Sequence, residues 1–273
     1  MKRFFYKEKD LPSTYNYFKK EGFITFKNIS KKNDVEDIFK SLFYLYNKYS
    51  KKKLKKYNKK KLNENLIKLR KNNKSAFSSI YDDAQICHST YKILHSEKVL
   101  EIGRILLGEK KNSPIGVSGT MLRLDPPHDN RNLYNWHQDH SYYHQNKSGT
   151  NGLVISIGLN NIDINNGALK VATRSHKSGY IDAKTIRKDF SSAQQYSISP
   201  KKIISYKTSL QTLKQCDLSA IYLDTMHASG DNLSNELRVT GLVRLHKIMS
   251  KDFRSYRDNT AFIDEIKKKI ILY

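Results

Sequence analysis

Cysteine, proline, acidic residues and long apolar runs are all scarce in this chain of 273 residues. Its two cysteines, Cys87 and Cys216, form no CxxC pair, which excludes a disulfide framework and a zinc site built on thiolates. The longest apolar run, residues 152–159, is far shorter than the ~20 residues that a membrane-spanning helix needs. The first ten residues lack the apolar core of a secretory signal. These absences predict a cytoplasmic protein with no membrane span.

The chain nevertheless contains ample material for a packed core. Hydrophobic residues make up 38% of the sequence, with 18 tyrosines and 11 phenylalanines. This composition excludes a collagen-like or wholly disordered chain. The 50 Lys and Arg against 26 Asp and Glu give a formal net charge of +24. An excess of this size favours anionic partners, whether nucleic acid, membrane surfaces or acidic small molecules.

Half of the excess positive charge lies in residues 48–75. This segment holds 13 Lys and Arg and a single acid, Glu64. Its apolar residues recur at roughly helical spacing and predict one basic, amphipathic helix over residues 48–75: Leu54, Tyr57, Leu62, Leu66 and Leu69. Charge runs of this kind are more often solvated faces than binding surfaces, and no recognised nucleic-acid motif accompanies this one. We therefore expect a solvated helix, with nucleic acid as the less favoured partner.

The two halves of the chain differ in pattern. Residues 1–110 are mainly helical in pattern, and Gly108 is a candidate C-cap. Over residues 115–248, short β-branched and apolar runs are separated by Asn, Gly, Pro and Asp clusters, which predicts an antiparallel sandwich, jelly roll or barrel. Residues 178–214 are irregular and polar, and we expect them to cover one mouth of the barrel. With no repeat and no clear linker, residues 1–273 are predicted to form a single domain.

The densest group of potential ligands lies in residues 135–140, Asn-Trp-His-Gln-Asp-His. On a strand, His137 and Asp139 project to the same face. On a helix, His137, His140 and His144 share a face instead, which would indicate zinc. The neighbouring turns and β-like runs favour the strand. With one more histidine, a His/Asp pair makes the two-histidine, one-carboxylate face that leaves positions open on iron(II).

His227 is the best candidate for that second histidine. It follows an apolar strand-like run and opens a polar turn, and Arg238 comes 11 residues later at the start of another strand. A planar guanidinium near an iron site suits the distal carboxylate of a dicarboxylate co-substrate. Ser229 and Ser234 offer hydroxyl donors nearby. The ordered combination of His-x-Asp, a second His and then Arg is far more specific than any of its parts.

In this combination the sequence resembles the phytanoyl-CoA hydroxylase (phytanoyl-CoA dioxygenase) family of iron(II)/2-oxoglutarate-dependent dioxygenases. Two specific motifs carry the resemblance: Trp136-His137-Gln138-Asp139 followed by Tyr142 and Tyr143, and His227-x-Ser229-x-x-Asn232-x-Ser234-x-x-x-Arg238. Weaker matches extend it over about residues 14–246: Tyr17 to Phe23, Leu106 to Gly108, Met121 to Pro127, Asn166 to Leu169, and Ser175-His176. Thr173-Arg174 stands where the family commonly has Pro-Gly, and the 48–75 segment has no counterpart.

The resemblance implies a double-stranded β-helix, a cupin-like jelly roll that is mainly β with an N-terminal helical half beside it. It implies that His137, Asp139 and His227 hold Fe(II), that Arg238 and Ser229 bind 2-oxoglutarate, and that O2 is the oxidant. The implied reaction is a hydroxylation that releases succinate and carbon dioxide, and the presence of Asp139 favours it over halogenation. Residues beside these motifs are candidates for substrate contacts: Trp136, Gln138, Tyr143 and Asn232.

Charge guides the expected substrate and the alternatives. Half of the +24 lies outside residues 48–75, so we expect a small, anionic metabolite. One alternative is a nucleic-acid-acting oxygenase, suggested by the total charge and by Arg238 and Arg244, which are spaced to share one strand face. Another is a non-catalytic β-sandwich module that binds metal or ligand. The close His-to-Arg spacing and the Ser/Asn/Ser pattern favour the small-molecule enzyme.

Overall fold

The computed structural model describes residues 3–6, 11–186 and 195–254. The helices are α1 (Leu11–Glu21), α2 (Lys32–Tyr49), α3 (Lys59–Asn72), α4 (Lys74–Gln85), α5 (His88–Leu94), α6 (Glu97–Leu106) and α7 (Pro200–Ile203). The strands are β1 (Phe4–Phe5), β2 (Phe23–Lys27), β3 (Gly116–Asp125), β4 (Gly152–Gly158), β5 (Leu169–Ala172), β6 (Lys184–Ile186), β7 (Gln195–Ser197), β8 (Thr208–Gln211), β9 (Leu218–Tyr222), β10 (His227–Ala228) and β11 (Arg238–His246). Short 3-10 helices are η2 (Asp139–Ser141), η3 (Gly149–Asn151) and η4 (Ser175–Ser178).

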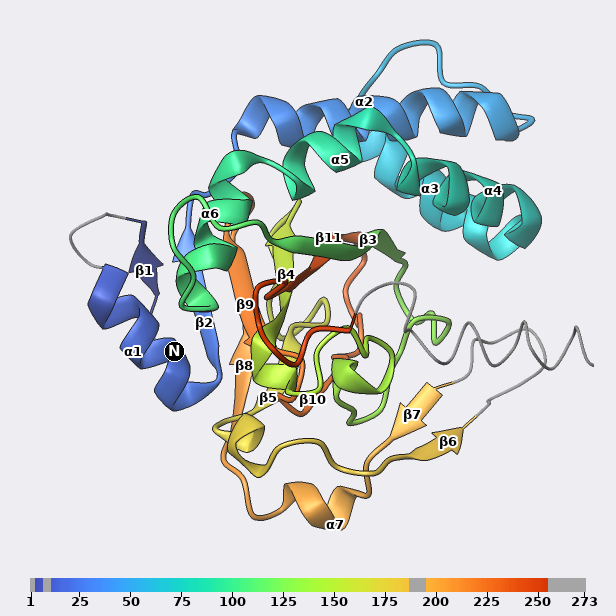
Figure 1. The fold of residues 1–273 in the computed structure, drawn as a ribbon. Coiled ribbons are helices and arrows are strands. Elements are labelled where there is room, and N and C mark those ends of the chain that lie inside the picture. The colour runs from blue at the N-terminus through green and yellow to red at the C-terminus, as the bar shows by residue number, and fades with distance from the viewer. Residues whose placement is uncertain (1–2, 7–10, 187–194, 255–273) are drawn as a thin grey trace, which may run out of the picture.

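The strands form two main sheets and one small ribbon. A six-stranded sheet has the order β1-β2-β9-β4-β11-β3, and a three-stranded sheet has the order β10-β5-β8. The ribbon pairs β6 with β7 and lies, with α7, on the opposite side of the strands from α2 to α5 (Figure 1). Residues of both main sheets line common cavities, so the inner faces of these sheets oppose each other.

Each central strand of the larger sheet separates two environments. Along β11, Val239, Val243 and Leu245 pack into the main apolar core, while Arg238 and Arg244 lie on the other face, toward the cavities. The same alternation runs along β3, β4 and β9, because successive side chains of a strand point to opposite faces. The outer face of the sheet is therefore apolar and the inner face carries the polar groups of the interior.

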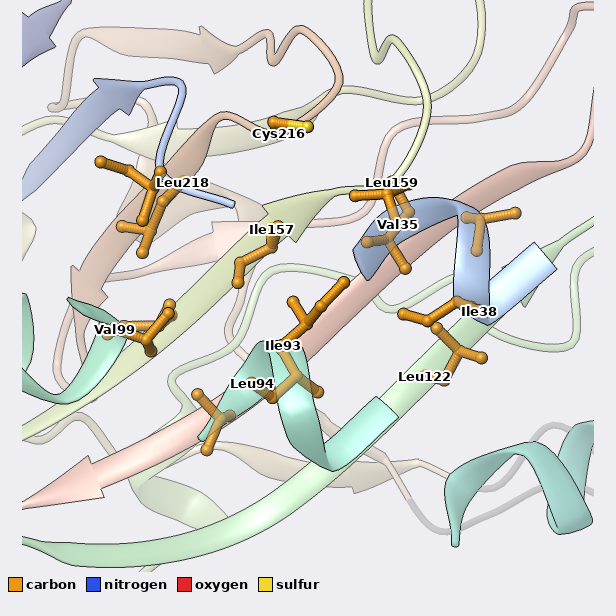
Figure 2. Close-up of a cluster of buried hydrophobic side chains, with 14 of the residues drawn as sticks. Val35, Ile38, Ile93, Leu94, Val99, Leu122, Ile157, Leu159, Cys216 and Leu218 are labelled. Carbon is orange, nitrogen blue, oxygen red and sulfur yellow. The ribbon is translucent and has the colours of Figure 1, made fainter. Parts of the chain in front are cut away.

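The helical half covers the outer face of the larger sheet. On α2, apolar residues recur three and four positions apart and are all buried: Val35, Ile38, Phe39, Leu42, Phe43 and Tyr46. This spacing makes one apolar stripe on a helix, which packs against a sheet. Figure 2 shows Val35 and Ile38 of α2 and Ile93 and Leu94 of α5 in one cluster with side chains of the sheet. The helices thus close one side of the fold and leave the inner face for the site.

The predicted single helix over residues 48–75 is wrong. Helix α2 ends at Tyr49, and α3 begins only at Lys59, where the side chain of Asn58 accepts a hydrogen bond from the N–H of Lys61. Between them, the Asn47 side-chain amide exchanges hydrogen bonds with the main chain of Leu54 and folds the loop back. These side-chain bonds to the backbone compete with helix formation.

The environment of the basic segment agrees with a solvated face. Leu62 and Leu66 are buried, and the other apolar residues named above pack partly against the core. Eleven lysines of the segment are exposed: Lys48, Lys51, Lys52, Lys53, Lys55, Lys56, Lys60, Lys61, Lys68, Lys71 and Lys74. Among the described residues, no helix combines the length and the apolar character needed to cross a membrane.

Candidate metal centre and its cavities

Two histidines stand opposite each other at the end of the smaller sheet. His137 and His227 form an isolated antiparallel bridge, and the main-chain N–H of each donates to the carbonyl oxygen of the other at 2.9 Å. Directly opposite residues of this kind place their side chains on the same face of a sheet. The two imidazole ring centroids lie 4.2 Å apart. Strand pairing therefore joins the first sequence motif to the second.

Both imidazoles are held in the same tautomer. Nδ1 of His137 lies 2.7 Å from the carbonyl oxygen of Asn135, and Nδ1 of His227 lies 2.8 Å from that of Thr225. Because a carbonyl oxygen only accepts, Nδ1 carries the proton in each ring, and each Nε2 keeps its lone pair for a metal. Burial and the neighbouring His227 lower the pKa of His137, which favours the neutral ring.

Asp139 completes this group from the first residue of η2. Its Oδ1 lies 3.3 Å from Nε2 of His137 and 3.4 Å from Nε2 of His227. The three residues are buried, and one ligand atom from each lies within 4.8 Å of the others. Two imidazoles and one carboxylate are the donor set of an iron(II) site with open positions. The residues present therefore fit iron(II).

Arg244 binds the other oxygen of Asp139. Its Nε and Nη2 donate to Oδ2 of Asp139 at 2.9 and 2.8 Å, and its Nη1 donates to the carbonyl oxygen of Gly119 at 3.0 Å. Burial alone would raise the pKa of Asp139, but the Arg244 guanidinium holds it well below its usual value. Asp139 is thus an ionised carboxylate that presents Oδ1 to the histidines.

The three clustered residues open onto a cavity of about 170 Å³. Tyrosines and a methionine form much of its wall: Tyr81 of α4, Met121 of β3, Tyr134, Tyr142 and Tyr143. Asp139 is the only carboxylate among the described residues that line this cavity, whereas Arg123 and Arg244 bring two guanidinium groups. The space beside the cluster is therefore aromatic and positively charged.

A smaller cavity of about 50 Å³ adjoins the first. The two share five lining residues: Arg123, Ser156, Leu169, Ser229 and Leu242. Arg238 and the hydroxyls of Ser219 and Thr240 lie in the lining of the smaller cavity. A molecule with one end at His137, Asp139 and His227 and the other in this cavity would meet a guanidinium and several hydroxyls there.

Arg238 is held by an aspartate. Its Nε and Nη2 donate to Oδ2 of Asp125 at 3.1 and 2.8 Å, and its Nη1 donates to the carbonyl oxygen of Gly167. Burial alone would raise the pKa of Asp125, but Arg123 and Arg238 lower it to about 2. A side chain on Gly167 would place its Cβ 2.5 Å from Nη1 of Arg238, and the φ of +96° also favours glycine.

The four expected substrate contacts lie in different places. Tyr143 lines the larger cavity. Gln138 points away from it, as alternation on an extended segment requires, and its side chain binds main-chain atoms of Gly179, Ile181 and Asp224. Trp136 packs in a separate apolar cluster that contains Ile198 and Met226.

Asn232 also has a structural position. Its Nδ2 donates to the carbonyl oxygens of Asp125 and Glu236 at 2.9 and 2.8 Å. Ser229, in contrast, borders both cavities, where its hydroxyl accepts from the N–H of Tyr134 at 3.1 Å. Of the six residues expected to bind co-substrate or substrate, Arg238, Ser229 and Tyr143 therefore reach one of the two cavities described above, and Trp136, Gln138 and Asn232 line neither of them.

Three polar residues of the interior were not among the predicted site residues. Arg123 and Asp125 lie on β3 with Met121, and Arg244 lies on β11. The sequence feature that could have revealed Arg123 and Asp125 is their spacing, because residues two apart on a predicted strand share a face. Arg244 shares a face with Arg238 for the same reason, but its spacing does not reveal that it binds Asp139.

The sequence profile of the family named phytanoyl-CoA dioxygenase matches residues 18–240, which is most of the chain. The chain belongs to the phytanoyl-CoA dioxygenase family. Membership confirms the resemblance seen in the motifs and the expected enzyme, an oxygenase dependent on iron and 2-oxoglutarate, and the His-Asp-His group fits that metal. It favours the enzyme over the non-catalytic β-sandwich module. No curated protein sequence matches the chain.

Solved structures confirm the double-stranded β-helix with its helical half. The epimerase SnoN in complex with Fe3+, alpha ketoglutarate and nogalamycin RO matches with a TM-score of 0.61 and 10% identity, over 88% of this chain and 84% of that one. The carbocyclase SnoK from nogalamycin biosynthesis matches with a TM-score of 0.58 and 11% identity, over 92% and 89%. EctD from S. alaskensis, with 2-oxoglutarate and 5-hydroxyectoine, matches with a TM-score of 0.55 and 15% identity, over 89% and 77%.

Proposed function

We propose that this member of the phytanoyl-CoA dioxygenase family hydroxylates a small, anionic metabolite, with 2-oxoglutarate and O2 as co-substrates and succinate and carbon dioxide as products. One observation carries the proposal. Two buried imidazoles with free Nε2 lone pairs face one oxygen of an ionised carboxylate beside a cavity. This arrangement supports a metal site of three protein ligands, His137, Asp139 and His227, with open positions for co-substrates.

In this proposal the protein's own groups fix the geometry of the metal ligands. The carbonyl oxygens of Asn135 and Thr225 orient the two rings, and Arg244 keeps Asp139 ionised with Oδ1 directed to the metal. Hydrogen bonds of this kind tune and orient metal ligands. When bound, iron(II) with 2-oxoglutarate as electron donor would activate O2, which is the oxidant that converts an unactivated C–H bond to an alcohol. The aromatic wall packs against the substrate and excludes water from the reacting carbon.

The smaller cavity supports the assignment of 2-oxoglutarate. Its distal carboxylate would meet Arg238 and Ser229, with the hydroxyls of Ser219 and Thr240 beside them. Because Asp125 and Gly167 already hold the guanidinium of Arg238, little conformational entropy is lost when the carboxylate binds.

The charges of the interior support an anionic substrate. Arg123, Arg238 and Arg244 line the two cavities, and the two carboxylates that contact them are those of Asp125 and Asp139. A cavity with an excess of positive charge and low-dielectric walls concentrates anions. The solved structures of similar fold include an epimerase, a carbocyclase and EctD, so the fold alone does not select the substrate.

The proposal is tested by anaerobic addition of Fe(II) and 2-oxoglutarate to the apoprotein. We expect the weak visible charge-transfer band of the chelated complex in the wild type, and its loss in His137→Ala, Asp139→Ala and His227→Ala. His88→Ala is the matched control, because His88 is exposed at the start of α5 and should leave the band unchanged. A wild type without the band would refute the proposed co-substrate, and a ligand variant that keeps the band would remove that ligand.

A further inference from the structure

Arg123 is the least satisfied of the three arginines that line the cavities. Both of its hydrogen bonds come from Nη2, to Oδ1 of Asp125 at 3.2 Å and to the carbonyl oxygen of Asn132 at 2.6 Å. Within the described part of the chain, its Nε is buried without a partner. An unpaired buried donor costs free energy that a bound acceptor recovers. Arg123 is therefore prepared for an acceptor that the protein does not supply.

The balance of charge indicates that this acceptor is an anion. Arg244 is neutralised by Asp139, while Arg123 and Arg238 share the single carboxylate of Asp125. Iron(II) and the dianion of 2-oxoglutarate cancel each other in charge. After both are bound, one positive charge of the interior has no counter-charge among the described residues that line the cavities. A buried charge is stable only when it is paired.

The place of Arg123 distinguishes it from Arg238. Arg123 borders both cavities, whereas Arg238 borders the smaller cavity and not the one that contains the metal-facing residues. The guanidinium of Arg123 lies 6.0 Å from the ring centroid of Tyr134, and that ring lies 5.4 Å from the ring of His137. Arg123 is thus one aromatic side chain away from the metal-facing histidine. A group that binds Arg123 from the larger cavity would therefore lie where the substrate is expected and not where the distal end of 2-oxoglutarate is expected.

On the basis of the proposed function, we infer that Arg123 binds a carboxylate of the substrate. The substrate class is a small carboxylic acid whose anionic end accepts from the guanidinium of Arg123. The rest of the molecule packs against Tyr81, Tyr134 and Tyr143. The other possible source of the carboxylate is 2-oxoglutarate itself, if its distal end met Arg123 in place of Arg238. The two sources predict different effects of the same substitution.

Arg123→Met is a suitable variant because it strands no buried charge. Asp125 retains two hydrogen bonds from Arg238 and one from the side chain of Asn132 at 3.0 Å. The matched control is Arg174→Met, which removes a half-exposed arginine that forms an ion pair with Glu21. Arg123→Lys keeps the charge and tests whether charge alone suffices.

The first measurement separates the two sources of the carboxylate. Fe(II) and 2-oxoglutarate are titrated anaerobically, and the charge-transfer band gives the affinity for 2-oxoglutarate. We expect Arg123→Met and Arg174→Met to match the wild type within about twofold, while Arg238→Met loses at least about tenfold, the value of a charged hydrogen bond. A loss in Arg123→Met equal to that in Arg238→Met would assign Arg123 to the co-substrate and overturn the inference. Absence of the band in the wild type would instead refute the proposed function.

The second measurement looks for the anion directly and needs no known substrate. Mn(II) replaces iron, 2-oxoglutarate is kept saturating, and the ¹⁹F relaxation of trifluoroacetate reports its approach to the paramagnetic metal. We expect a saturable relaxation effect in wild type and in Arg174→Met. The affinity for trifluoroacetate that it gives should fall at least about tenfold in Arg123→Met and be partly restored in Arg123→Lys. Trifluoroethanol, which is neutral, should show no saturable relaxation effect. No saturable effect in the wild type, or an equal effect in Arg123→Met, would overturn the inference.

Discussion

Arg244 donates two hydrogen bonds to a single oxygen of Asp139, so the other oxygen of that carboxylate is the one left for a metal. Arg244 lies on β11, whereas Asp139 lies in η2, and the contact spans more than 100 residues of sequence. The orientation of a metal-facing group thus depends on the packing of the large sheet. This dependence can be measured.

We predict that Arg244→Met lowers the affinity for Fe(II) about 10- to 100-fold, the usual cost of losing a hydrogen-bond partner of a metal ligand. Removal of the guanidinium also raises the pKa of the buried Asp139, so the loss should be larger at low pH. Anaerobic Fe(II) titration at two pH values measures both effects. An unchanged affinity would show that the histidines alone orient the carboxylate.

We predict that Arg238→Met weakens the binding of 2-oxoglutarate at least about tenfold, because the substitution removes a buried cation that pairs with a carboxylate. Ser229→Ala should have a smaller effect of about tenfold or less, since it removes one neutral hydroxyl. The charge-transfer titration gives both affinities, and thermal unfolding of each variant controls for the loss of the Asp125 pair. Equal 2-oxoglutarate affinity in wild type and Arg238→Met, with the fold intact, would show that another cation binds the distal carboxylate.

His246 should make the protein less stable in mild acid. Burial, with Arg244 and His140 nearby, lowers the pKa of His246 from 6.5 to about 4. Between these values the unfolded chain binds a proton that the folded chain does not, so the free energy of unfolding falls as pH decreases from 6.5 toward 4. The total loss is at most about 3 kcal/mol. Urea unfolding at pH 7 and pH 5 gives the change in the free energy of unfolding between the two pH values. This change should be smaller in His246→Gln than in wild type, and an equal change in both would contradict the prediction.

We predict that the exposed lysines are dispensable for the proposed chemistry. Replacing Lys51, Lys52, Lys53, Lys55 and Lys56 by glutamine should leave the charge-transfer band and the 2-oxoglutarate affinity unchanged, because these side chains are exposed in the loop between α2 and α3. The same variant tests the nucleic-acid alternative through salt-dependent oligonucleotide binding. Strong wild-type binding that the variant loses would revive that alternative, whereas no binding by the wild type would remove its main support.

Local pattern was sufficient to predict much of the candidate site. His137 and Asp139 are two residues apart, which places them on the same face of any extended segment, and His227 and Arg238 follow with family spacing. The same alternation places Gln138 on the opposite face, where the structure has it. Local pattern failed in the basic segment, because helical spacing of apolar residues does not reveal that Asn47 and Asn58 bind the backbone and interrupt the helix.

The amino-acid sequence by itself determined the fold class, the family and the three clustered residues, since these depend on local periodicity and on motifs that are short in sequence. Only the tertiary structure decided which charges pair. Arg238 lies directly opposite Asp125 in the register of β11 and β3, and Arg123 is left with an unpaired Nε. The alternation of side chains predicts which residues of a strand share a face. Which residue of the neighbouring strand lies opposite each of them depends on the strand register. Register is set by packing between distant segments of the chain.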